Sequence, residues 1–165
     1  MTELYRKNVG IVLFNKDKKV LVCARADQRK MNWQFPQGGI DAGEDIVKAA
    51  FRELGEETGI TSASLVSVLP KPLRYNFPPQ ILAHAQSLGR MFIGQEQTWV
   101  LLFFCGDDSE IRFDANPEEI EFKAFEWIDI KEAPKRIVPF KKMVYTEVAK
   151  AFEPLIQNFS QGSNK

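Results

Sequence analysis

The stretch WQFPQGGIDAGEDIVKAAFRELGEETGI, residues 33–60, decides the fold and raises a question about charge. Its second half, residues 45–58, begins with acidic residues and continues with the apolar spacing of an amphipathic helix. At about 100° per residue, Glu56 and Glu57 lie within about 60° of Glu53, so three carboxylates share one face. Like charges three or four residues apart destabilise an isolated helix by roughly 0.2–0.5 kcal/mol per pair. We therefore expect something nearby to offset their repulsion.

A solvated acidic face is the ordinary interpretation of such a charge run. Two features favour a cation site instead. Ala49 and Ala50 flank the face and are expected to leave room for a ligand, and Gly38, Gly39 and Gly43 allow the preceding loop to approach a metal closely. Clustered carboxylate oxygens are what Mg²⁺ or Mn²⁺ requires, together with waters and substrate phosphates. The stretch therefore predicts a divalent cation site.

Composition indicates one globular domain. The chain has 165 residues, of which 44% are hydrophobic, enough for one core and too few for two ordinary domains. We expect a single domain over residues 1–158 and a disordered tail over residues 159–165. Because 22 basic residues balance 22 acidic ones, no overall field marks the chain as a binder of nucleic acids or membranes. Any affinity for polyanions must be local.

Cysteine usage and the N-terminus bear on the compartment. Cys23 and Cys105 are isolated in apolar runs, which makes neither a disulfide framework nor a zinc pattern. The first residues lack the apolar core of a signal peptide, and no apolar run is long enough to span a bilayer. These features predict a soluble cytoplasmic protein.

The remaining pattern predicts a mixed sheet with one helix in the middle of the chain and one at its end. Strands are expected over residues 8–15, 19–25, 64–70, 72–77, 98–106 and 122–130, the first two as a hairpin. The paired prolines of residues 78–90 predict a loop. A closing amphipathic helix is expected from about residue 139. This order is typical of an α/β sandwich with three layers.

The same stretch carries a recognisable motif. Its specified positions are Gly38, Glu44, Arg52, Glu53, Leu54, Glu56, Glu57, Gly59 and Ile60. This set resembles the Nudix box of the Nudix hydrolases at every specified position, a match expected by accident with a chance on the order of 10⁻⁹ per starting point. The resemblance implies a Nudix-type α-β-α sandwich with a mixed central sheet. It also implies metal-dependent hydrolysis of a nucleoside diphosphate linked to another group.

By that resemblance, several residues receive roles at a metal site. The expected ligands are Glu53, Glu56 and Glu57 on the helix, Gly38 in the loop before it, and Glu121 at a later strand. Arg52 is expected to orient a ligand carboxylate, and Glu44 to support the loop. Glu118 and Glu119 are near enough in sequence to rival Glu121, which is also expected to take part in activating water. Mg²⁺ or Mn²⁺ is implied, with more than one ion.

Motifs outside the box narrow the resemblance to one branch. They are WQFPQGGID, LRY from Leu73, IGQEQTW from Ile93, EFKAFEW from Glu121 and PFKK from Pro139. They resemble the RNA pyrophosphohydrolases and the asymmetrical diadenosine tetraphosphate hydrolases. Two substrates stay open, RNA 5′-triphosphate ends, which release pyrophosphate, and diadenosine tetraphosphate, which gives ATP and AMP. The alternatives are a house-cleaning hydrolase of nucleoside triphosphates or sugar nucleotides and a non-catalytic nucleotide- or RNA-binding module.

Such a substrate has several phosphates and a base, which selects candidates among cations, aromatics and amides. Phosphate contacts are expected from Arg6, Arg25, Arg74 and Lys141. Stacking on a nucleobase is expected from Tyr75 and Phe140. Further substrate contacts are expected from Gln37, Gly38, Gly39, Gln95 and Gln97, the last two lining the cleft. The large aromatics Trp33, Phe35 and Trp99 are expected in the core, and the single histidine, His84, is assigned no role.

Overall fold

The protein is built around one mixed β-sheet of eight strands, seen in a computed structural model that describes residues 4–27 and 32–160. The strands are β1 (Tyr5–Phe14), β2 (Val20–Arg25), β3 (Trp33–Gln34), β4 (Gln37–Gly39), β5 (Ala63–Val68), β6 (Leu73–Asn76), β7 (Gly94–Phe104) and β8 (Phe122–Ile128). The main path runs β3-β2-β1-β7-β5, while β4 pairs with β1, β6 with β7 and β8 with β2. The long strands β1 and β7 are parallel, and every other pair is antiparallel.

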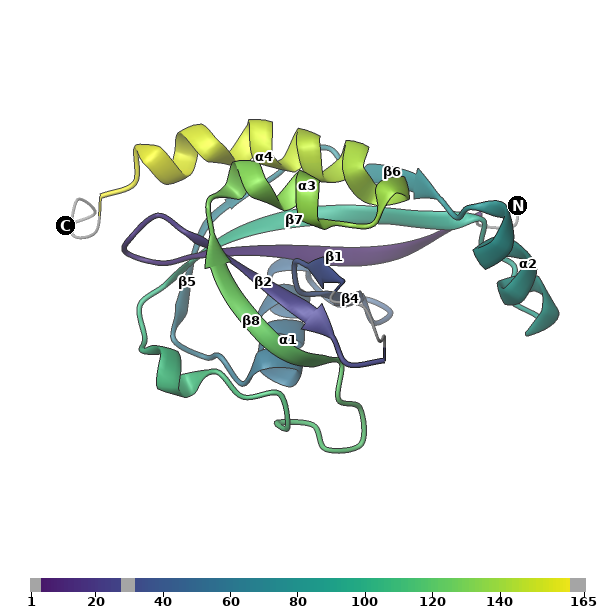
Figure 1. Cartoon of the computed structure of the whole chain (residues 1–165), viewed down its shortest axis with the longest axis horizontal. Helices are drawn as coiled ribbons and strands as arrows, with labels where there is room; N and C mark the ends of the chain where they lie inside the picture. Colours follow the sequence, from purple (N-terminus) through teal and green to yellow (C-terminus); the bar gives the residue numbers. More distant parts are fainter. Residues whose placement is uncertain (1–3, 28–31, 161–165) are drawn as a thin grey trace.

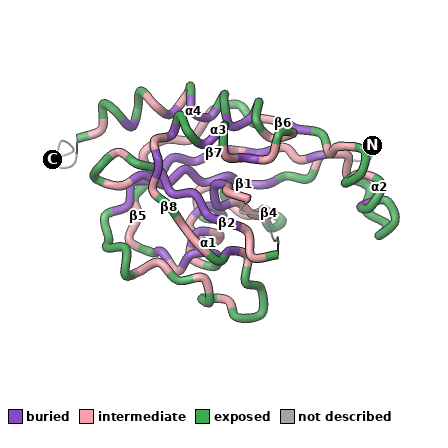
Figure 2. Tube along the Cα trace, viewed as in Figure 1, coloured by how far each residue is buried: buried purple, intermediate pink, exposed green. Residues whose placement is uncertain are grey.

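Helices cover both faces of this sheet, as Figure 1 shows. One face carries α1 (Ile46–Thr58), and the other carries α3 (Ala133–Arg136) and α4 (Lys142–Gln157). The expected three-layer α/β sandwich is therefore confirmed. Two hydrophobic clusters fill the layers, one around Leu54 on the α1 side and one around Trp99 and Phe152 on the α4 side. Figure 2 shows that burial follows the central strands.

Helix α1 lies within the expected range, residues 45–58, and both of its ends are capped. The carboxylate of Asp45 accepts hydrogen bonds from the backbone N–H groups of Val47 and Lys48, both at 3.1 Å, so it is the N-cap. Gly59 closes the helix in the left-handed conformation, with φ of 74°. One expectation was wrong: Ala49 and Ala50 are fully buried, so they bring α1 close to the sheet and leave no room for a ligand.

The segment expected as a loop contains a helix, α2 (Pro79–Ser87), which projects from one end of the molecule in Figure 1. The paired prolines do exclude a strand, but proline suits the first turn of a helix because its fixed φ is already helical and no N–H is needed there. Pro78 is the N-cap residue, and Gly89, with φ of 76°, lies just beyond the helix end.

The C-terminal part of the chain differs in small ways from expectation. Residues Pro139–Lys141 form a 3₁₀ turn, so the closing helix α4 begins at Lys142. Most of the expected tail, residues 161–165, lies outside the described residues. Phe159 packs its ring against Phe14 and Phe103, at centroid distances of 5.1 and 4.6 Å. No helix in the described part of the chain has the length and hydropathy needed to cross a membrane.

Candidate active site

Arg52 joins the acidic residues of α1 to the loop before it. Its guanidinium donates to both carboxylate oxygens of Glu44, at 2.8 and 2.9 Å, and to the carbonyl oxygen of Gly39 at 3.0 Å. It also donates to Glu53 at 2.9 Å and to Glu56 at 3.2 Å. The hydrogen bonds from Arg52 and from the backbone of Asp41 lower the pKa of Glu44 to about 2. A positive side chain therefore offsets part of the repulsion on this helix face.

Glu57 is the carboxylate that Arg52 does not reach. It is only 7% exposed, and its pKa is raised well above the usual value, first by burial and then by the negative charges of Glu53 and Glu121. Burial also raises the pKa of Glu53, which shares a hydrogen bond with Glu57. Among the described residues, no group partners the Oε2 atom of Glu57. Burying a carboxylate oxygen without a partner costs free energy, and a bound proton or cation would remove that cost.

Gly38 makes room for this cluster. A Cβ atom at position 38 would collide with the carboxylate of Glu53, so only glycine lets β4 pass beside α1 here. Strand β4 also fixes the position of Gln37, whose backbone N–H donates a hydrogen bond to the Glu57 carboxylate. The loop before α1 thus shapes the acidic cluster directly, as its glycines suggested.

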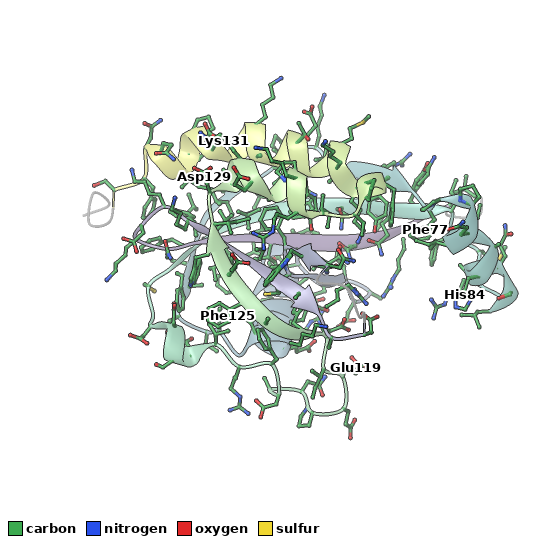
Figure 3. The ribbon with its side chains drawn as sticks, viewed as in Figure 1. Phe77, His84, Glu119, Phe125, Asp129 and Lys131 are labelled. Carbon is green, nitrogen blue, oxygen red and sulfur yellow. The ribbon has the colours of Figure 1, made fainter. Side chains whose placement is uncertain are left out.

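Glu121 is the later acidic residue that lies by the cluster. Its charge acts on both Glu57 and Arg25, and its carbonyl oxygen accepts from the backbone of Ala26 at 2.8 Å. Its rivals Glu118 and Glu119 are exposed, and Figure 3 shows Glu119 on the loop that precedes β8. Of the three residues, Glu121 is thus the one with an electrostatic interaction with Glu57.

These residues fit a hard divalent cation by their chemistry. The donor set is carboxylate oxygen, and the unpartnered Oε2 atom of Glu57 lies in its midst. Among the described residues, no three acidic, histidine or cysteine side chains already converge as a metal-binding group. Because Arg52 holds Glu53 and Glu56, these two carboxylates would have to turn from it toward an ion.

Three cations surround Tyr75 on the other side of the sheet. The Lys141 ammonium lies 5.4 Å from the centre of the Tyr75 ring, and the charges of Arg25 and Arg6 both act on the tyrosine hydroxyl. Burial, followed by the charge of Arg25, lowers the pKa of Lys141 to about 8. The Arg25 guanidinium is held by Asp27 through hydrogen bonds of 2.9 and 2.7 Å. Since Arg25 also lies within the field of Glu57 and Glu121, it connects the acidic cluster to these cations.

Tyr75 itself is not an open stacking surface. It is 7% exposed, its ring packs against Phe77 and Phe140 at 6.0 and 5.6 Å, and its hydroxyl donates to Gln95 at 2.6 Å. The expectation that Tyr75 stacks on a base is therefore corrected, because aromatic neighbours already cover the ring. Phe140 is partly exposed, and stacking of a base on its ring stays a prediction.

Arg74 and Gln97 also differ from expectation. Arg74 pairs with Glu96 at 2.9 Å and lies over the ring of Tyr5 at 4.5 Å. Since neighbouring strand residues point to opposite faces, Arg74 lies across the sheet from the cations around Tyr75. The side chain of Gln97 is 1% exposed, and its amide donates a hydrogen bond to the side chain of Gln37 at 2.6 Å. Gln97 therefore holds the Gln37 side chain in place and does not line an open cleft.

The structure adds residues that the sequence did not single out. Asn8 accepts from the Gln97 amide at 3.0 Å, and the Tyr145 hydroxyl accepts from the backbone of Phe35 at 2.9 Å. Both contacts join residues far apart in the chain, so no local pattern indicates them. Asp27 was missed as well, although an acidic residue two positions after Arg25 was a usable signal.

Comparison with known proteins decides the family. The chain matches the family described as NUDIX domain over residues 4–148. The chain belongs to the Nudix family. Curated Nudix relatives include the RNA pyrophosphohydrolase of Caulobacter vibrioides, 45% identical over 169 residues that cover 99% of this chain and 95% of that protein. The protein of the same name from Sphingopyxis alaskensis is 42% identical over 155 residues, 92% of this chain and 95% of that protein.

Solved Nudix structures agree with this fold. The E. coli dihydroneopterin triphosphate pyrophosphohydrolase superposes with a TM-score of 0.67 at 21% identity, covering 95% of this chain and all of that chain. A C. elegans Ap4A hydrolase binary complex gives a TM-score of 0.62 at 20% identity, covering 92% and 99% of the two chains. The expected family, fold class and Nudix pyrophosphohydrolase activity are confirmed. Nudix hydrolases generally use divalent metals.

Proposed function

We propose that this Nudix hydrolase removes pyrophosphate from the 5′-triphosphate end of RNA and leaves a 5′-monophosphate. The observation that carries the proposal is the identity of 45% and 42% to curated relatives named RNA pyrophosphohydrolase, over nearly the whole chain. The solved diadenosine tetraphosphate and dihydroneopterin triphosphate hydrolases are at most 21% identical and support the fold alone. No observation favours their substrates for this chain.

The proposed metal site holds Mg²⁺ or Mn²⁺, with more than one ion. Its ligands are Glu53, Glu56, Glu57 and Glu121, with the backbone of Gly38. Bound cations would neutralise the phosphate oxygens and lower the pKa of the attacking water. If Glu53 and Glu56 bound an ion, Arg52 would still be held by Glu44 and the Gly39 carbonyl, which would keep the loop and helix together.

The chain's own residues position the substrate. Arg25, Lys141 and Arg6 are the proposed phosphate contacts, because they gather around Tyr75 and such cations bind phosphates through charge-assisted hydrogen bonds. Among these three, Arg25 also lies in the field of Glu57 and Glu121. The partly exposed ring of Phe140 is the proposed contact for the first base, next to Lys141. The proposed floor of the site consists of Gln37, Gly39 and Gln95, which is supported by the contacts of Gln95 with Tyr75, of Gln37 with Gln97 and of Gly39 with Arg6.

Glu121 is the proposed acceptor of the proton that the attacking water loses. Its side chain is half-buried, lies in the field of Glu57, and makes no hydrogen bond to another side chain described here. A carboxylate within reach of the water can take its proton as the new bond to phosphorus forms.

We propose a cytoplasmic location for this activity. Cys23 is buried and Cys105 is exposed, and both are free thiols. An exposed free thiol is compatible with a reducing compartment.

The test compares two substrates. The protein is incubated with Mg²⁺ or Mn²⁺ and, separately, with triphosphorylated RNA and diadenosine tetraphosphate, and the products are separated and quantified. The proposal expects pyrophosphate and 5′-monophosphate RNA to form with a higher kcat/KM than ATP and AMP. Faster cleavage of diadenosine tetraphosphate, with no pyrophosphate from RNA, would contradict it.

A further inference from the structure

A groove runs between α3 and α4, outside the acidic cluster and the cations around Tyr75. It has a volume of about 530 Å³. Figure 1 shows the two helices side by side on the outer surface of the sheet, with α4 running back along α3. The walls of the groove include Lys131, Lys135, Lys142 and Lys150, and its apolar surface includes Pro134 and Pro154. We refer to it as the α3–α4 groove.

The α3–α4 groove is strongly basic in a chain with no net charge. Four lysines line it, against one carboxylate, Glu153. Lys135 has an acidic neighbour, Glu132, at 3.6 Å. The side chains of Lys131, Lys142 and Lys150 form no ion pair with any residue in the described ranges 4–27 and 32–160. A polyanion would therefore meet available positive charge here.

The groove begins where the candidate active site ends. Lys141, which lies over Tyr75, is followed directly by Lys142, the first residue of α4 and a wall of the groove. From Lys142 to Lys150 the helix rises about 12 Å, the length of roughly three to four stacked nucleotides. Lys131, labelled in Figure 3, lies on the opposite wall, in the 3₁₀ turn Ile130–Glu132 that precedes α3.

We propose that the α3–α4 groove binds the single-stranded RNA that follows the triphosphorylated end, through its phosphates. The inference rests on the proposed function and extends it from the reacting end to the body of the substrate. A free nucleotide is too short to reach both sites, whereas an RNA whose first base lies at Phe140 leaves along α4. Proline and alanine side chains between the lysines allow the ribose and base to approach without reading their sequence.

The test varies the length of the RNA. The variant Lys131→Gln/Lys142→Gln/Lys150→Gln removes three charges, and Lys16→Gln/Lys19→Gln/Lys71→Gln, at exposed lysines elsewhere, removes the same number. Each protein is assayed with a triphosphorylated dinucleotide and with a triphosphorylated RNA of about twenty unpaired nucleotides. For the groove variant we expect KM to rise about tenfold for the long RNA only. Its slope of log KM against log salt should fall by about 2.

Each outcome has one meaning. The control variant is expected to match the wild type on both substrates, and thermal melting checks that both variants are folded. An equal change on dinucleotide and long RNA, or no change on either, would overturn the groove proposal. Equal losses in the control variant would overturn it too, since net charge and not the groove would then be responsible. If the wild type hydrolyses neither substrate, the proposed function fails instead.

Discussion

Glu57 combines a buried charge with a central place in the acidic cluster. Its pKa is raised, first by burial and then by Glu53 and Glu121, so the folded state binds its proton more tightly than the unfolded state does. Stability from this group is present below the unfolded pKa and is lost as pH rises through the raised folded pKa. Glu57 therefore lowers the stability of the metal-free protein at pH values above its unfolded pKa.

The variant Glu57→Gln should separate stability from activity. Without metal at pH 7.5 we expect its melting temperature to exceed that of the wild type, because glutamine removes the cost of burying an ionisable carboxyl group. With metal we expect RNA hydrolysis to fall by at least about a hundredfold. Calorimetry and pyrophosphate release measure the two effects, with the exposed Glu118→Gln as control. A lower melting temperature in the absence of metal would contradict the buried-charge explanation.

Lys141 gives the site a predicted pH dependence. Burial lowers its pKa to about 8, so it is charged below that pH and neutral above it. If Lys141 contacts a phosphate, the loss of its charge as pH rises through 8 should lower kcat/KM for triphosphorylated RNA by about tenfold in total. Lys141→Arg should extend the plateau to higher pH, and Lys141→Gln should show the low value throughout. Superimposable pH profiles of wild type and Lys141→Arg would exclude this role.

At the scale of elements, two glycines of one short stretch should respond in opposite ways to alanine. A Cβ at Gly55, inside α1, meets only a carbonyl oxygen at 3.8 Å, whereas one at Gly38 would collide with the Glu53 carboxylate. Gly55→Ala should stabilise the protein by about 0.5–1 kcal/mol, through the lower entropy of its unfolded chain, and keep activity. Gly38→Ala should displace Glu53 and raise the Mg²⁺ concentration needed for half-maximal rate. Melting curves and Mg²⁺ titrations test both, and equal Mg²⁺ requirements would be evidence against the Gly38 contact.

The sequence predicted elements whose signals are local. The caps of α1 at Asp45 and Gly59 follow from residue type alone, and so does the apolar run that became β7. Helix α2 was missed because prolines that exclude a strand also suit a first helical turn. Arg74 and Tyr75 were both assigned to the substrate, although adjacent strand residues must face opposite sides. Burial of Tyr75 under Phe77 and Phe140 depends on contacts between distant segments, which one sequence does not reveal.

At the scale of the whole molecule, charge is balanced in sum and separated in space. The acidic cluster lies on α1, while Arg6, Arg25 and Lys141 gather around Tyr75 on the α4 side. Basic residues continue along the α3–α4 groove. A triphosphate between the two groups would meet cations from the protein on one side and bound metal on the other. The net charge of zero conceals this arrangement, which only the fold reveals.

The carboxylates of α1 are proposed to hold the divalent cations that hydrolysis of a 5′-triphosphate requires. The most direct test is the initial rate of pyrophosphate release from triphosphorylated RNA as a function of Mg²⁺ concentration, for the wild type and Glu57→Gln. We expect no wild-type rate without a divalent cation, saturation as Mg²⁺ rises, and a Glu57→Gln rate at least about a hundredfold lower at every concentration. A Glu57→Gln variant that saturates with Mg²⁺ at the wild-type rate would contradict the account.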